Sequence, residues 1–470
     1  MIRKWLAVGI ILLFVGTCII PAIAQNIEPL PISRGNWLYV GGSGAGNYTK
    51  IQDAIIASSD GDTIFVFNGT YHEHIVIDKA INLLGEDVNT TTINDDVSNS
   101  HAIIIQQNHV LITGFTLFGE GIHYSIYSYQ SRYNITIEGN NIIGRYGLYL
   151  QSTHNIIRNN FISVHVGGSC GIETTRAFTT IEQNRIFAPV GTGISVDDGS
   201  NIINANLIVA PNPSQIEGVH NVISNNTFQN SGLWFTHPSD NILTNNTVNG
   251  KPLVYFDRKS DRVIDYDAGQ VILVGCDNVT ITNQNISDSP VGIQVFESTR
   301  CSISNNTISS AGIVFYNSDT IKVLNNTIHS STIAIGKYRF DEEYTTNNII
   351  ISRNTITSDV PGGNRIYIVS VDNLIFSYNH VVNTSLELHY FCHNCVFCCN
   401  NFMVSKFIDV EVPIFSYNKF RYNYWGELRL FPKFIFGYVF VPEQIPSNYL
   451  YWFFIDWHPA QEPYDIPGAR

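Results

Sequence analysis

The amino-acid sequence predicts an all-β fold: a single-stranded right-handed parallel β-helix with a cap at each end. The first observation is a short pattern that occurs twelve times between Asn140 and Asn401. It reads apolar residue, two fillers, Asn (once Gln284), one filler, apolar residue, with Cys398 in the first apolar position of the last unit. The second observation is that most units are 20–28 residues apart, with Ser, Thr, Asn and Gly as common fillers. Such a period in β-branched segments is typical of a solenoid whose coils stack around a shared core, and parallel crossovers are right-handed.

The central Asn of each unit is predicted to point into the solenoid. Asn tolerates the left-handed backbone of a turn. Asn residues stacked in register also hydrogen-bond up and down their column, which satisfies buried amides. The expected internal ladder includes Asn226, Asn246, Asn306 and Asn326. The apolar residues three before and two after each centre are expected to face the core, including Cys398 and Met403 in the last unit.

Composition and the N-terminal segment indicate an exported protein. The chain has 470 residues, of which 14% are charged, and a formal net charge of −13. Residues 1–24 combine Arg3 and Lys4 with an apolar run and a small-residue cleavage site, which predicts a signal peptide and no membrane span in the mature chain. An acidic exported protein is a poor partner for nucleic acid or anionic membranes, and binds polyanionic sugars only through a bridging cation. Eleven Asn-x-Ser/Thr triplets, including Asn47 and Asn68, fit a glycosylated exterior.

The solenoid is expected to lie between two caps. Residues 25–74 are predicted to form the N-terminal cap leading into the first coil, with a helix over Tyr48–Ser58 and a strand over Thr63–Phe67. Residues 75–422 form the β-helix, and the aromatic-rich residues 423–470 form the C-terminal cap.

The longest step, 38 residues between Asn246 and Gln284, is interpreted as one coil that lost its Asn and gained a charged turn over Asp257–Asp261.

Six segments along the chain carry a specific resemblance: Gly44–Phe67, Asn68–Glu73, Ile81–Glu86, Asn249–Phe256, Asn423–Gly426 and Asp456–Ala460. They resemble archaeal exported β-helix repeat proteins of the NosD-like family. The resemblance implies a pectin-lyase-like solenoid, a fold shared with enzymes that act on pectin and alginate. Founding members of the family help to mature the copper site of nitrous oxide reductase, so it also implies a metal-handling accessory protein as one alternative function.

One cluster of Cys and His residues has the spacing of a soft-metal site. His389, Cys392, His393 and Cys395 are its candidate ligands, since Cys-x-x-Cys is a familiar zinc spacing. In an exported protein a disulfide is the commoner outcome for such cysteines. The leading expectation is therefore structural cysteines or a disulfide and no cofactor, with copper, zinc and calcium left open.

Asp197 and Asp198 are the candidate catalytic residues. Paired carboxylates resemble the acid and base of β-helix enzymes that cleave pectin. Those enzymes also carry a Gly-His-Gly and an Arg-x-Lys, and neither tripeptide occurs in this chain. The alternative is a solvated acidic turn formed with the help of Gly199.

The leading functional hypothesis is an exported, noncatalytic protein that binds carbohydrate or another cell-surface component along its stacked face. Tyr149 and Trp234 are the main candidates for stacking on sugar rings. Tyr146, Phe235, Phe296 and Tyr316 are further aromatic residues expected outside the core columns. The alternative from another class is a polysaccharide lyase or hydrolase that uses acidic residues on one face.

Overall fold

The computed structural model describes residues 35–95, 100–236, 238–336, 346–403, 408–413, 416–427, 431–440 and 449–466. The predicted signal peptide, residues 1–24, lies outside this part of the chain. Within the described residues, no helix has both the length and the apolar character needed to span a membrane.

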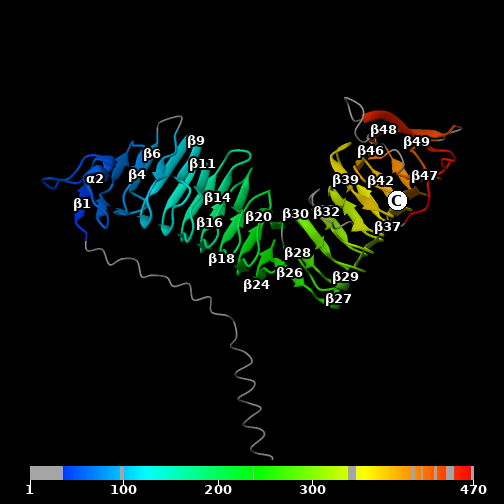
Figure 1. Ribbon diagram of the computed structural model, residues 1–470, viewed down its shortest axis with the longest axis horizontal. Coiled ribbons are helices and arrows are strands. Elements are labelled where there is room, and N and C mark those ends of the chain that lie inside the picture. Colours follow the sequence, from blue (N-terminus) through cyan, green and yellow to red (C-terminus); the bar gives the residue numbers. More distant parts are fainter. Residues whose placement is uncertain are drawn as a thin grey trace, which may run out of the picture.

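The protein is an all-β parallel solenoid, which confirms the predicted fold class (Figure 1). One coil illustrates the construction: β12 (Ile156–Arg158), β13 (Phe161–Val164) and β14 (Cys170–Thr174) follow one another around the stack. Each strand pairs in parallel with its counterpart one coil later, for example Ile157 with Ile181 and Ile162 with Ile186. These Ile residues are completely buried, so the apolar columns of the sequence form the core.

The central Asn residues form hydrogen-bonded ladders inside the solenoid. The backbone N–H and the side-chain amide of Asn226 both donate to Oδ1 of Asn246, at 3.0 Å each, and Asn306 bonds to Asn326 in the same way. The amide of Asn306 also donates to the carbonyl of Ile281, one coil earlier. The left-handed backbone lies one residue before each centre, as at Asn225 (φ 57°) and Asn305 (φ 57°), so that part of the prediction was off by one residue.

The predicted register of the last repeat was also off by one residue. The ladder continues from Asn379 to Asn400 and then to Asn423, so Asn400 is the centre of this coil rather than Asn401. Phe397 and Phe402 are therefore the buried residues, whereas Cys398 and Met403 are only half-buried. The repeat pattern is satisfied with either Asn400 or Asn401 as the centre, because apolar or Cys residues stand at the required positions in both cases. Centring on Asn400 places the larger Phe side chains in the core, which they fill better.

The stack changes direction at the long step between Asn246 and Gln284 (Figure 1). A ten-stranded sheet from β1 (Trp37–Val40) to β24 (Ile242–Thr244) ends there, and an eight-stranded sheet from β27 (Ser260–Ile264) to β47 (Lys419–Arg421) begins. A hairpin at Asn249-Gly250 lies at this point, where both residues have positive φ, as in a type I′ turn.

The hairpin reverses the chain from β25 (Thr247–Val248) into β26 (Lys251–Asp257), which runs antiparallel to β25. β26 then pairs in parallel with β28 (Gln270–Val274), as expected for one extra coil that lacks the Asn. The sequence interpretation of an extra coil is confirmed, but it missed the reversal.

Two buried glutamine side chains join the two stacks. Gln270 accepts a hydrogen bond from the N–H of Leu233 and donates to the Leu233 carbonyl, at 2.9 and 2.7 Å. Gln294 also donates to that carbonyl and accepts from the N–H of Phe235. The edge strand β23 (Leu233–Phe235) thereby has its backbone groups satisfied by side chains of the second stack.

The N-terminal end of the solenoid carries the helix α2 (Ile51–Ala57), which is shorter than the predicted Tyr48–Ser58. The carboxylate of Glu73 accepts from the N–H groups of Ile51 and Gln52, at 2.8 and 3.0 Å. These are the free donors at the start of a helix, so Glu73 caps α2 and closes this end of the stack.

Candidate functional site

The two aromatic residues predicted to stack on sugars, Tyr149 and Trp234, lie in one outward column of the first stack. The column runs through five successive coils and is formed by Tyr149, Glu173, Ser195, Gln215 and Trp234. Four coil steps of about 4.8 Å separate its ends by about 19 Å. The side chains of the column are half-buried or exposed, whereas their strand neighbours Leu148, Ile172 and Phe235 are buried.

Around Tyr149 the face carries a cluster of aromatic rings, called the tyrosine cluster below. Its members come from β9 (Thr116–Ser128), β11 (Asn141–Leu150) and the segment before β7 (Ile103–Ile105). The cluster consists of His101, Tyr124, Tyr127, Tyr146 and Tyr149. Tyr124 stacks on Tyr149 with ring centroids 5.0 Å apart, and His101 stacks on Tyr127 at 4.4 Å. Mutual packing holds the rings in fixed orientations on the outer face.

Carboxylates lie beside the tyrosine cluster. The hydroxyl of Tyr124 donates to Glu173 at 2.6 Å, and burial followed by this hydrogen bond raises the Tyr124 pKa well above its usual value. Two further acids, Asp197 and Glu217, follow equivalent strands of neighbouring coils. The backbone N–H of Asp197 donates to the carbonyl of Thr174, and that of Glu217 donates to the carbonyl of Val196. The face therefore passes from aromatic rings into an acidic region.

The predicted catalytic pair is divided between two roles. The Asp197 side chain is exposed, yet its pKa is raised above the usual range. The largest cause is partial desolvation by neighbouring protein atoms, and the second is repulsion from Glu217, Glu173 and Asp198. Asp198 bonds through Oδ1 to the N–H of Gly199, while its carbonyl accepts from the amide of Asn201. Asp198 thus contributes hydrogen bonds to its own turn, whereas Asp197 is the member whose pKa responds to neighbouring carboxylates.

Trp234 forms the other end of the face, next to the change of direction. Its ring lies 6.2 Å from that of Tyr316 in the second stack, in a T-shaped arrangement, and both residues are half-buried. Phe235 is fully buried and Phe296 is 4% exposed, so the prediction that they lie outside the core was wrong. Phe235 follows the outward Trp234 by one residue, and strand alternation turns it inward.

The two Cys candidates for metal binding lie together inside the core. Cys392 and Cys395 are completely buried, and their thiols contact backbone carbonyls such as those of His389 and His393. Contact with Cys392 and burial raise the Cys395 pKa. The half-buried His389 side chain lies 3.7 Å from Glu387. Within the described residues, no group of three or more His, Cys, Asp or Glu is placed to hold a metal ion. Without a third ligand among the described residues, the Cys392–Cys395 pair does not complete the four-ligand set of a structural zinc site.

Sequence reasoning missed Glu173, Glu217, Tyr124 and Tyr127, the residues that surround Asp197 and Tyr149. The repeat alone does not find them. Glu173 and Asp197 both stand thirteen residues after their ladder centres, Asn160 and Asn184, yet the strand pairing places Glu173 beside Ser195. Glu217 stands eleven residues after its centre because that coil is shorter, so its alignment depends on the observed strand pairing.

Two family models match parts of this chain. The model described as a right-handed β-helix region matches residues 212–338 and 269–424. The model described as a periplasmic copper-binding protein (NosD) matches residues 55–231. These matches support a right-handed β-helix protein of NosD-like type, and the periplasmic family fits an exported protein. No curated protein matches the chain in sequence.

Several solved β-helix structures are similar in overall form. The A-module of mannuronan C-5 epimerase AlgE4 from Azotobacter vinelandii is 15% identical, with 74% of this chain and 95% of that one covered and a TM-score of 0.32. DFA-IIIase from Arthrobacter chlorophenolicus A6 is 12% identical, covering 70% and 95%, with a TM-score of 0.37. The tailspike of E. coli bacteriophage HK620, solved with a pentasaccharide, is 13% identical, covering 81% and 74%, with a TM-score of 0.38. Likenesses this distant carry no argument about activity.

Proposed function

We propose that this protein is an exported, noncatalytic β-helix protein that binds an extended carbohydrate along the face between Tyr149 and Trp234. The observation that carries the proposal is the single column in which aromatic rings stand at both ends and Glu173, Ser195 and Gln215 stand between them. Aromatic faces pack on the C–H faces of sugar rings, and the polar side chains between them exchange hydrogen bonds with hydroxyl groups.

The charge of the face favours a neutral polymer. Glu173 and Glu217 lie close enough to Asp197 to raise its pKa, so the three carboxylates form one negative region. A polymer of uronic acids would meet repulsion there, while the carboxylates accept hydrogen bonds from neutral sugar hydroxyls. The ligand class that fits is a neutral polysaccharide of a cell envelope or extracellular matrix.

Affinity electrophoresis tests this proposal. The protein is run through native gels that contain neutral glucan, mannan or galactan, or the anionic polymers alginate and pectate. A neutral polymer is expected to retard the wild type, and the double variant Tyr149→Ser, Trp234→Ser is expected to lose this retardation. The matched control is Tyr266→Ser, Trp457→Ser, because both rings are exposed and neither lies in the column. Equal retardation of both double variants, or no retardation by any neutral polymer, contradicts the proposal.

A second candidate function has one observation in its favour. A carboxyl with a raised pKa beside other carboxyl groups is the arrangement of a general acid in glycoside hydrolysis, and the pKa of Asp197 is raised. New reducing ends or unsaturated products from a bound polymer, lost in Asp197→Asn, would establish a hydrolase or lyase. Binding without any such product supports the noncatalytic proposal.

A further inference from the structure

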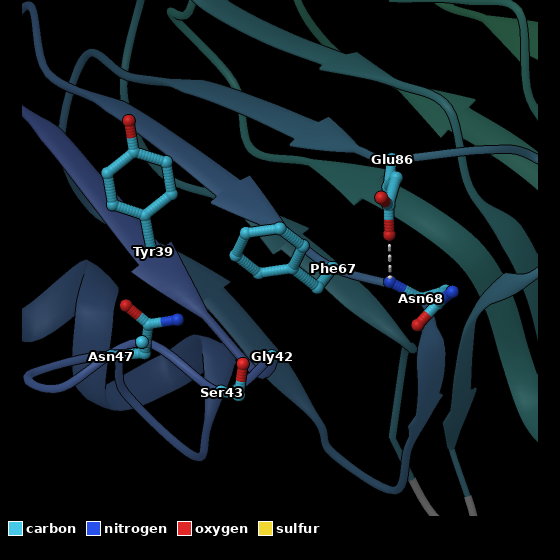
Figure 2. A pocket seen from close by; sticks show the side chains of 8 residues that line it. Tyr39, Gly42, Ser43, Asn47, Phe67, Asn68 and Glu86 are labelled. Carbon is cyan, nitrogen blue, oxygen red and sulfur yellow. Dashed lines mark hydrogen bonds between the residues drawn. The ribbon is translucent and has the colours of Figure 1, made fainter.

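A cleft at the N-terminal end of the solenoid lies apart from the face described above. Its volume is about 450 Å³, and its walls include Tyr39, Ser43, Asn47, Phe67, Asn68 and Glu86. Figure 2 shows the rings of Tyr39 and Phe67 along one side and Ser43 and Asn47 on the loop below them. This volume falls in the range of small-molecule sites.

The aromatic side of the cleft is fixed in place. Tyr39 on β1 stacks on Phe67 with ring centroids 6.1 Å apart and an interplanar angle of 28°. Phe67 also meets Phe65 of β2 (Thr63–Val66) edge-on at 5.1 Å. Tyr39 nevertheless remains 41% exposed, and Phe67 is half-buried. Rings that are rigid and partly open to solvent offer a preformed apolar surface to a ligand.

The loop that closes the cleft is held by its own hydrogen bonds. The N–H of Gly41 donates to the carbonyl of Tyr48, the N–H of Tyr48 donates to Tyr39, and the amide of Asn47 donates to the Gly41 carbonyl at 2.6 Å. Gly42 has a positive φ of 66°, and a Cβ there would lie 2.8 Å from the Phe67 ring. Glycine at this position therefore lets the loop pack closely against the aromatic side.

Polar groups also line the cleft. Oε2 of Glu86 accepts a hydrogen bond from the backbone N–H of Asn68 at 2.8 Å (Figure 2). This bond holds the Glu86 carboxylate beside Asn68. The side chains of Asn68 and Glu86 are exposed. Two amides, one hydroxyl and one carboxylate thus line the cleft together with the rings. This donor and acceptor set matches a compact ligand with one apolar face and several hydroxyl groups.

We propose that the cleft between Tyr39, Phe67, Asn47 and Glu86 is a binding site for a single pyranose unit, such as the end of a glycan. The C–H face of the sugar ring packs on Phe67 and Tyr39, and its hydroxyls bond to the amides and to the carboxylate. This site is separate from the polymer-binding face, so either site is able to function without the other.

Saturation-transfer NMR with methyl α-D-glucopyranoside, methyl α-D-mannopyranoside and methyl β-D-galactopyranoside tests the proposal, with glycerol as the control for nonspecific contact. The full chain is produced in a host that does not glycosylate Asn-x-Thr sites, because Asn47 and Asn68 both lie in such triplets. Two variants act on the cleft: Ser43→Trp fills it from the exposed loop, and Tyr39→Ser removes an exposed ring.

The expected result is transfer to at least one pyranoside that disappears in both cleft variants and persists in Tyr149→Ser. Transfer to none of the three sugars, or transfer that survives Ser43→Trp and Tyr39→Ser in folded protein, overturns the proposal. The two proposals fail separately, because the gel experiment reports on polymer binding by the other face and its variants leave the cleft intact.

Discussion

Asp456 terminates the asparagine ladder by binding Asn423. Its carboxylate accepts hydrogen bonds from the backbone N–H of Asn423 at 2.9 Å and from the side-chain amide of Asn423 at 3.2 Å. It also accepts from the N–H of Tyr422 and the indole N–H of Trp425, and its side chain is fully buried. Asp456 belongs to β49 (Tyr449–Asp456), so a strand from the C-terminal end supplies the acceptor that the next coil would otherwise supply.

Removal of this carboxylate is expected to destabilise the C-terminal end of the solenoid. Asp456→Ala leaves buried N–H donors without acceptors, at about 1–3 kcal/mol for each donor. Thermal or denaturant unfolding measures the loss, and Glu462→Ala is the control because Glu462 is exposed. An Asp456→Ala variant as stable as the control would show that the ladder needs no terminal acceptor.

A break inside the ladder should have a comparable effect. Asn306→Leu leaves the N–H of Gln284 and the carbonyl of Ile281 without partners, at about 1–3 kcal/mol for each group. Ser304→Asp changes a half-buried outward residue of the same coil and should be nearly neutral. Melting temperatures of the two variants decide the point. A lower value for Ser304→Asp than for Asn306→Leu contradicts the observed register.

Thiol labelling tests the register of the last coils. Cys398 and Cys399 are half-buried, whereas Cys170, Cys276, Cys301, Cys392 and Cys395 are buried. Iodoacetamide should therefore modify the first pair fastest in the native state, as followed by mass spectrometry. Because burial and Cys399 raise the Cys398 pKa, a mildly alkaline buffer is appropriate. Faster labelling of Cys392 or Cys395 would place those thiols outside the core.

The acidic region predicts a pH-dependent gain of stability in Asp197→Asn. The pKa of Asp197 is raised in the folded state, so this carboxyl binds its proton more tightly folded than unfolded. Its ionisation consequently lowers stability as the pH rises through the folded pKa. The variant should be more stable than the wild type at neutral pH, by less than about 1 kcal/mol because solvent screens an exposed group. The difference should vanish in acid, and an equal difference at both pH values contradicts this account.

The sequence predicted the coils because their core columns repeat at a nearly constant period. Ile157 and Ile162 could be placed inward without a structure, since apolar residues stand three before and two after the central Asn in nearly every unit. Asn400 and Asn401 both fit the repeat pattern as the centre of the last unit. The packing of Phe397 against Phe376 in the structure identifies Asn400 as the centre. The period alone contained no information on this choice.

The candidate site was less predictable because it depends on residues brought together by coils of unequal length. Tyr149 and Trp234 were identified as outward aromatics, but their common column depends on four successive pairings among five strands. The reversal at Asn249-Gly250 had a sequence signal, since Asn-Gly between strands favours a type I′ hairpin. The interpretation from the repeat did not include this hairpin, because a coil that lacks its central Asn explained the 38-residue step equally well.

The dependence of affinity on oligosaccharide length tests the central proposal most directly. Calorimetry is carried out on the Ser43→Trp variant, which closes the N-terminal cleft, with oligomers of the neutral polymer that retards the protein. Affinity is predicted to rise with each added sugar until the chain reaches from Tyr149 to Trp234, about 19 Å for four coil steps, and then to stay level. An affinity for single sugars equal to that for long oligomers would contradict an extended site along this column.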